Sequence, residues 1–233
     1  MQPSDIIQKL ESLANPEAIK GMARFGTNPE HTYLISIPNL RETTRETWID
    51  HDLAKQLWTT GIHKARILTG MIDNPMLVTG KQMEAWVKDF DSWDICDRCC
   101  MNLSDKIHFA YKNAADWSER EEEFIKREGF ALMAVLAFHD KKTQDERFLK
   151  FLAMIKQEST DQRTLVKKAM NWALRQIGER DFNLNRMAIK RAEDIKDFDT
   201  KSAKWIASDA IRALTSEGIQ KRLTKMKQYQ TQN

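Results

Sequence analysis

Proline is confined to the first third of this chain. All five prolines lie at or before Pro75, and residues 76–233 contain none. Proline inside a helix removes a backbone hydrogen bond and clashes with the preceding turn, so a long proline-free stretch permits helices almost throughout. The same stretch is rich in alanine, leucine, lysine, glutamate, methionine and glutamine, which have high helix propensity. The sequence therefore predicts an all-α fold.

Apolar residues recur at the spacing of amphipathic helices in segment after segment. This spacing predicts helices over 4–14, 16–25, 39–58, 61–72, 79–90, 92–102, 104–113, 119–138, 144–156, 161–178, 182–196, 200–214 and 217–229. The gaps are short and contain no Ser/Gly-rich linker, so a single domain over residues 1–233 is the economical interpretation. Short helices joined by tight turns are typical of a bundle or of an α-solenoid of stacked helix pairs. The sequence shows no repeat regular enough to decide between these two.

The composition argues against several classes of protein. No apolar run reaches the roughly 18 residues of a membrane span, and the N-terminus lacks the basic and apolar regions of a signal peptide. Cys96, Cys99 and Cys100 crowd into one helical turn, which favours reduced thiols in the cytoplasm over a disulfide framework. A zinc site would need a fourth ligand, for which His108 is the nearest candidate. Small buried side chains are the alternative role, and no metal or organic cofactor is expected.

The excess of basic over acidic residues is confined to parts of the sequence. The chain carries a net charge of +3, and residues 181–233 hold 11 basic and 7 acidic residues. The segment from Arg163 to Arg175 holds four basic residues and no acidic one. A local basic surface is compatible with a nucleic-acid partner.

Trp172 lies in that basic segment. On a helical wheel, Lys168, Trp172 and Arg175 fall opposite the apolar stripe of the helix over 161–178. An aromatic ring between two cations suits contact with a nucleic-acid backbone. The structural alternative is that Trp172 packs against a neighbouring helix.

Trp93 and Asp97 form a second candidate pair. They stand four residues apart, so a helix places them on one face, beside the apolar positions of the helix over 92–102. A carboxylate next to an indole is partly desolvated and stabilises a nearby positive charge more strongly than in water. The alternative is a carboxylate favoured by the helix dipole, with Trp93 in the core.

Arg127 borders the apolar stripe of the helix over 119–138. A guanidinium there needs an anionic partner, which could be a phosphate or a carboxylate. A structural ion pair with one of the glutamates at 119–123 or with Glu128 is the alternative to phosphate binding.

In their order and spacing, these segments resemble the AlkD-like DNA alkylation repair family of HEAT-like-repeat DNA glycosylases. The resemblance runs over most of the chain. The matching segments are residues 22–25 (MARF), 37–41 (IPNLR), 92–97 (SWDICD), Lys126-Arg127 and 168–175 (KAMNWALR). Phe25 stands where the family has a tyrosine, so one hydroxyl hydrogen bond is lost while the aromatic wall is kept.

The resemblance implies a curved stack of antiparallel helix pairs whose concave face holds duplex DNA. It implies a monofunctional glycosylase, acting as a monomer, that excises N3-alkyladenine and N7-alkylguanine without flipping the base. Asp97 would stabilise the positive charge on the sugar and position water. Trp93 and Trp172 would contact the deoxyribose and backbone, with Arg127 on a phosphate. Phe25, Lys168 and Arg175 would complete the DNA contacts.

Two other functions are compatible with the same residues. The protein could be a member that binds duplex or branched DNA without excising bases. The phenylalanine at position 25, where the family has a tyrosine, is compatible with that function. A HEAT-type scaffold could instead bind protein, which would make the basic surface incidental. Duplex binding that weakens steeply with salt would distinguish a DNA-binding protein from such a scaffold.

Overall fold

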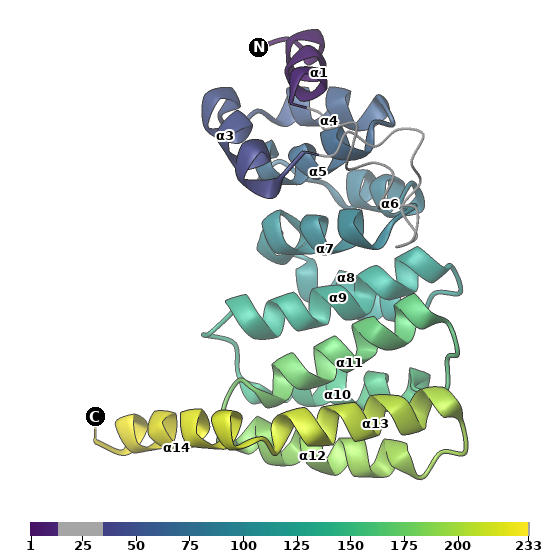
Figure 1. Cartoon of the computed structure of the whole chain (residues 1–233), viewed down its shortest axis with the longest axis vertical. Coiled ribbons are helices and arrows are strands. Elements are labelled where there is room, and N and C mark those ends of the chain that lie inside the picture. Colours follow the sequence, from purple (N-terminus) through teal and green to yellow (C-terminus); the bar gives the residue numbers. More distant parts are fainter. Residues whose placement is uncertain (14–34, 233) are drawn as a thin grey trace. The chain divides into compact units, whose positions relative to one another are not determined.

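The computed structural model describes residues 1–13 and 35–232, and this part of the chain consists of helices and short turns, without strands. The all-α prediction is confirmed (Figure 1). The helices are α1 (Pro3–Ser12), α3 (Ile37–Thr47), α4 (His51–Thr59), α5 (His63–Ile72), α6 (Gly80–Lys88), α7 (Trp93–Asn102), the 3-10 turn η3 (Ser104–Lys106), α8 (Ala110–Ser118), α9 (Glu123–His139), α10 (Asp145–Glu158), α11 (Thr164–Gly178), α12 (Phe182–Lys196), α13 (Lys201–Leu214) and α14 (Glu217–Gln232). The helix expected over 16–25 lies outside the described residues. None of the described helices has the length and apolar character needed to cross a membrane.

The chain divides into two compact units, residues 1–110 and 111–233. The single domain over 1–233 stays a prediction. In the first unit α5 is central, because α3, α4 and α7 all pack against it and α1 covers α4 and α5. The buried side chains of Leu10, Leu57 and Leu68 form part of this core. The three cysteines of α7 are also buried, as expected for small core side chains.

The second unit has two layers of helices. Helices α9, α11 and α13 form one layer, α10 and α12 form the other, and α14 packs against α12 and α13. Consecutive helices are joined by short turns and therefore run antiparallel. Each pair buries its apolar face on the next pair, which is the construction of a helical solenoid. The predicted stack of helix pairs is thus confirmed over the alternative of a closed bundle.

The single helix expected over 39–58 is wrong. Helix α3 ends before Trp48, which has a positive φ of 60°. A separate helix, α4, begins at His51. Asp50 caps the new helix, its carboxylate accepting a hydrogen bond from Leu53 N at 3.0 Å. The side-chain spacing continues across this break, so periodicity alone cannot show it, whereas Asp50 is a strong N-cap residue that could have.

The helix expected over 104–113 is also misplaced. The structure has the short turn η3 and then α8, which begins at Ala110 and ends at Ser118. Between them Ile107 is extended, with a ψ of 145°, and its side chain is 3% exposed. Burial of Ile107 from an extended backbone outweighs the helical propensity of the segment.

Candidate nucleic-acid interface

Helix α7 presents Trp93 and Asp97 on its accessible side. The helix buries Ile95, Cys96 and Cys99 against the first unit, which leaves the flanking positions near the surface. Trp93 is the first residue of the helix and is 38% exposed, while Asp97, one turn later, is half-buried. The alternative that placed Trp93 in the core is therefore wrong. A ring and a carboxylate one turn apart can approach one ligand together.

Asp94 fixes the start of α7. Its Oδ1 lies 2.9 Å from His63 Nε2, and its Oδ2 lies 4.0 Å from Lys64 Nζ. Burial alone raises the pKa of Asp94, but the hydrogen bond and charge of His63 and the charge of Lys64 outweigh it, so the pKa lies below its usual value. Burial also lowers the pKa of Lys64, and the charge of Asp94 partly opposes this. This ion pair ties the first turn of α7, which begins at Trp93, to α5.

We expect Asp94→Asn to lower the free energy of unfolding at pH 6 by about 1.5–3 kcal/mol, the range for a hydrogen bond to a charged group. A depressed carboxyl pKa stabilises the fold above the unfolded-state pKa, and this stabilisation is lost as pH falls through the folded-state pKa. The difference between wild type and variant should therefore shrink at pH 3. Urea titrations at both pH values measure it, with the exposed Asp91→Asn as control. A difference that is equal at pH 3 and pH 6 would contradict this assignment.

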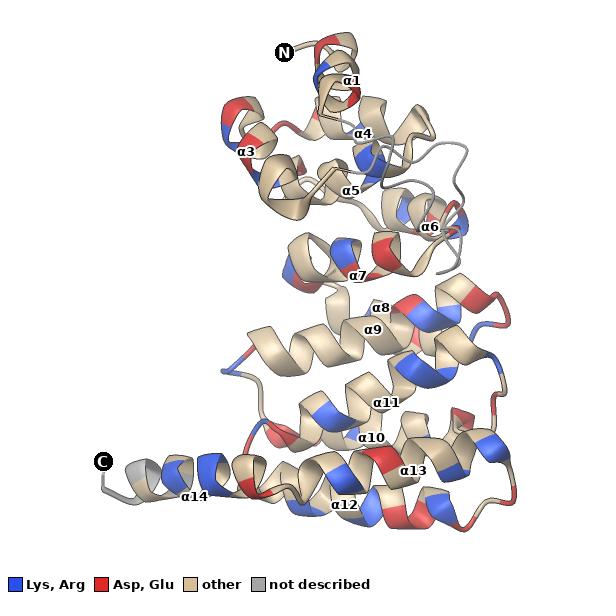
Figure 2. Cartoon of the chain, viewed as in Figure 1, with Lys and Arg blue, Asp and Glu red and all other residues tan. Residues whose placement is uncertain are grey.

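Helix α11 matches the expected division into two faces. Its apolar positions are buried: Val166, Met170, Ala173, Leu174 and Ile177. On the other side Lys168 is exposed and Trp172 is half-buried. The Arg175 side chain is 39% exposed, and its Nη1 lies 3.7 Å from Asp209 Oδ2. Figure 2 shows basic residues along α11 and α14, whereas the C-terminal half of α9 is uncharged.

A second aromatic residue joins this surface. Trp205 on α13 is 40% exposed, and Lys167 Nζ lies 5.5 Å from its ring centroid. The sequence interpretation missed this pair, although Trp205 lies four residues after Lys201 and beside Lys204 in a basic stretch that could have signalled it. The α11–α13 surface therefore offers two tryptophans, Trp172 and Trp205, with cations around them.

Arg127 is 5% exposed in α9, so its side chain belongs to the interior of the second unit and not to the charged surface. Its neighbour Lys126 is equally deep and forms ion pairs with Glu158 at 2.8 Å and Asp161 at 3.8 Å. A buried guanidinium is stable only with a negative partner. The choice between a phosphate and a carboxylate at Arg127 stays a prediction.

Two further sequence interpretations concern the role of Phe25 and the possibility of a metal site. Phe25 lies outside the described residues, so its role stays a prediction. Among residues 1–13 and 35–232, no group of three or more His, Cys, Asp or Glu side chains is arranged to hold a metal ion. The His63–Asp94–Lys64 network had no sequence signal, because its members come from two helices about thirty residues apart.

The two-layered stack of antiparallel helix pairs defines a HEAT-like repeat protein. The sequence model of the family described as "DNA alkylation repair enzyme" matches residues 6–214, and the chain belongs to this family. One similar solved structure is described as "a new family of proteins related to the HEAT-like repeat DNA glycosylases with affinity for branched DNA structures". It superposes with a TM-score of 0.77 at 18% identity, covering 91% of this chain and 95% of that chain, and so supports the fold. No curated protein matched the sequence.

Proposed function

We propose that this protein is a DNA glycosylase that removes cationic alkylated purines, N3-alkyladenine and N7-alkylguanine, from duplex DNA by hydrolysis of the N-glycosidic bond. One observation carries the proposal. In a chain of the DNA alkylation repair family, Trp93 is exposed on the first turn of α7, and the half-buried Asp97 lies one turn away.

The residue types suit this chemistry. An N-alkylated purine already carries positive charge, so it departs with the electrons of the glycosidic bond without needing a general acid. The positive charge then moves onto the sugar. A preorganised carboxylate lowers the energy of that oxocarbenium-like transition state, and the face of an indole attracts the same charge. Asp97 and Trp93 take these two roles, and water adds to the sugar carbon and gives up a proton, completing hydrolysis.

The second unit supplies the DNA contacts of the proposal. Exposed Lys168 and half-exposed Arg175 contact backbone phosphates, and Trp172 packs against the deoxyribose between them. These contacts set the register of the DNA without reading its sequence. Arg127 is 5% exposed, so its proposed role is to position the residues that contact phosphates. The damaged base is excised while the backbone is gripped, so a base-specific pocket and base flipping are not required.

The reaction is proposed as hydrolysis alone. A lyase step needs an accessible uncharged lysine to attack the sugar carbon. Burial lowers the pKa of Lys64, but this lysine is 5% exposed and lies beside Asp94. It is therefore assigned to the structural ion pair.

The direct test is base release. We expect purified protein to liberate N7-methylguanine and N3-methyladenine from dimethyl-sulfate-treated duplex, detected by chromatography, at a rate above the enzyme-free control. Methylated duplex incubated with heat-denatured protein measures spontaneous depurination. A native protein that releases neither base beyond that level would overturn the proposed activity.

A second candidate is a protein that binds branched DNA without excising bases. It is favoured by the affinity for branched DNA stated for the similar solved structure. Binding and base-release assays distinguish the two functions. Tight binding to a three- or four-way junction without base release supports the second candidate. Base release from an unbranched duplex supports the first.

A further inference from the structure

A groove of about 260 Å³ lies within the second unit, where α9 and α11 end and α14 passes. Phe138 of α9, Gln176 of α11 and Met226 of α14 line it. Gln176 lies one helical turn beyond Trp172, so the groove continues from the basic face of α11. Helix α14 lies beyond residues 6–214, which the family model matches.

The groove is electropositive. Its charged lining consists of Lys141, Arg180 and Arg222 against the single carboxylate of Glu179, a net charge of +2. Arg222 Nη2 donates to the backbone oxygen of Glu179 at 3.1 Å and to its carboxylate at 3.0 Å. Burial lowers the pKa of Lys141, and the charges of Arg180 and Arg222 lower it further. These cations repel one another, so an anion placed among them is stabilised.

Arg180 holds the groove in shape. Its guanidinium donates to the backbone oxygens of Ala137 at 3.1 Å and Thr143 at 2.9 Å, and also to that of Asp140. It further lies over the ring of Phe148, 4.2 Å from the centroid. The turn after α9 is thereby fixed, and with it the positions of Phe138 and Lys141. The anion site is therefore preorganised.

An exposed aromatic ring borders these cations. Phe138 is 55% exposed, and Lys141 Nζ lies 5.3 Å from its ring centroid. Met226, 39% exposed, adds a second apolar side chain. A cationic groove with an accessible ring is how proteins bind single-stranded nucleic acid, with phosphates on the cations and a base on the ring.

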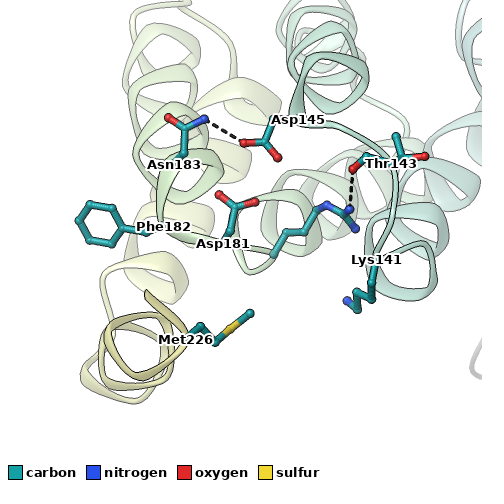
Figure 3. Close-up of a pocket in the computed structure, with 8 residues that line it drawn as sticks. Lys141, Thr143, Asp145, Asp181, Phe182, Asn183 and Met226 are labelled. Atoms are coloured by element: carbon teal, nitrogen blue, oxygen red, sulfur yellow. Dashed lines mark hydrogen bonds between the residues drawn. The ribbon is translucent and has the colours of Figure 1, made fainter. Parts of the chain in front are cut away.

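The neighbouring pocket has different electrostatics. It measures about 760 Å³ and shares Lys141, Arg180 and Met226 with the groove, but it adds the carboxylates of Asp145 and Asp181. Figure 3 shows the side chains that line this pocket, among which Asn183 donates to Asp145 at 2.9 Å. Burial raises the pKa of Asp181, and the charge of Asp145 raises it further. This pocket is balanced in charge, so phosphate binding is favoured in the smaller groove.

We propose that the groove binds an unpaired DNA strand, with a phosphate between Lys141 and Arg222 and a base stacked on Phe138. In a duplex the base faces are covered by stacking, so only an unpaired strand can offer one to Phe138. The assignment rests on the proposed function in one respect, since it takes DNA as the substrate. It adds a preference for DNA in which a single strand leaves the duplex.

The test compares two probes by fluorescence anisotropy: a blunt duplex and the same duplex with a single-stranded thymidine tail. We expect wild type to bind the tailed probe about tenfold more tightly. Lys141→Gln/Arg222→Gln should abolish this preference and reduce the salt dependence of tail binding by about one phosphate contact. Phe138→Leu, which keeps an apolar side chain, should weaken tail binding about fivefold. Lys150→Gln/Lys190→Gln removes two exposed lysines outside the groove. This control variant should keep the wild-type preference for the tailed probe and the wild-type salt dependence of tail binding.

Several outcomes would overturn the assignment. These are equal affinity of wild type for both probes, an unchanged preference in the groove variant, and competition by polyglutamate as strong as that by oligothymidine. The last would mean that charge alone, as in an acidic peptide, occupies the groove. Tail preference does not depend on base release. A wild type that prefers the tail but frees no base therefore upholds the groove and rejects the glycosylase, and one that binds neither probe rejects both.

Discussion

Replacing Asp97 by asparagine should reduce the single-turnover release of N7-methylguanine by about 100- to 1,000-fold, the typical cost of removing one preorganised electrostatic contact to a transition state. The amide keeps the size of the side chain and removes its negative charge. The half-buried position of Asp97 makes that charge effective, because little water screens it. Affinity for the methylated duplex should be nearly unchanged, because the charge on the sugar develops only during the reaction.

The control for this variant is Asp91→Asn, an exposed carboxylate just before α7. It removes the same charge a short distance away and should leave base release within about twofold of wild type, since exposed charges are strongly screened. If Asp97→Asn releases base at the wild-type rate, the assignment of Asp97 is wrong even where the glycosylase activity itself is observed. If both variants lose activity equally, the effect is one of general charge and not of position.

The second large effect is expected at Gly129. A Cβ there would lie 2.8 Å from Ser118 Cα and from the carbonyl carbon of Trp117, and closer still to Ser118 N. These are backbone atoms at the end of α8, which cannot move aside as a side chain can. Gly129→Ala should therefore force α8 and α9 apart and destabilise the second unit by about 3 kcal/mol or more.

Thermal unfolding measures this effect, and a loss of that size corresponds to a fall in Tm of roughly 6–12 °C for a chain of this length. The matched control is Gly218→Ala on α14, where a Cβ meets no atom within 4 Å. It should be neutral or stabilising by up to about 1 kcal/mol, because alanine has the better helix propensity. A Gly129→Ala protein as stable as wild type would show that α8 and α9 can separate without cost.

Much of the fold could be predicted from the sequence because amphipathic spacing is a local property. The buried face of α11, with Val166, Met170 and Ile177, follows from spacing alone. The errors occur where a few residues decide the backbone path. At Trp48 the chain takes a positive φ within an otherwise regular pattern, and at Ile107 burial outweighs helix continuation.

The candidate site likewise has features that could be predicted from one helix and features that depend on packing between helices. Exposure of Lys168 and half-burial of Trp172 follow from their place on one helix, which a wheel can represent. The partners of Asp94 could not be found, because His63 and Lys64 belong to another helix and meet it only through packing. The groove beside Phe138 was missed for the same reason, since its side chains come from three helices and from the turns that follow α9 and α11.

The way α14 is attached allows its groove residues to change without altering the packing of the other helices. Gln220 donates to the backbone oxygen of Leu214 at 2.6 Å and to the side-chain oxygen of Asn185 at 3.1 Å, while Leu223 is fully buried. These contacts dock α14 on the ends of helices that are already complete. Arg222 and Met226 can therefore be exchanged without repacking any helix within residues 6–214. Recognition of an unpaired strand would then be tunable by substitutions in this one appended helix, while the chemistry assigned to α7 stays constant.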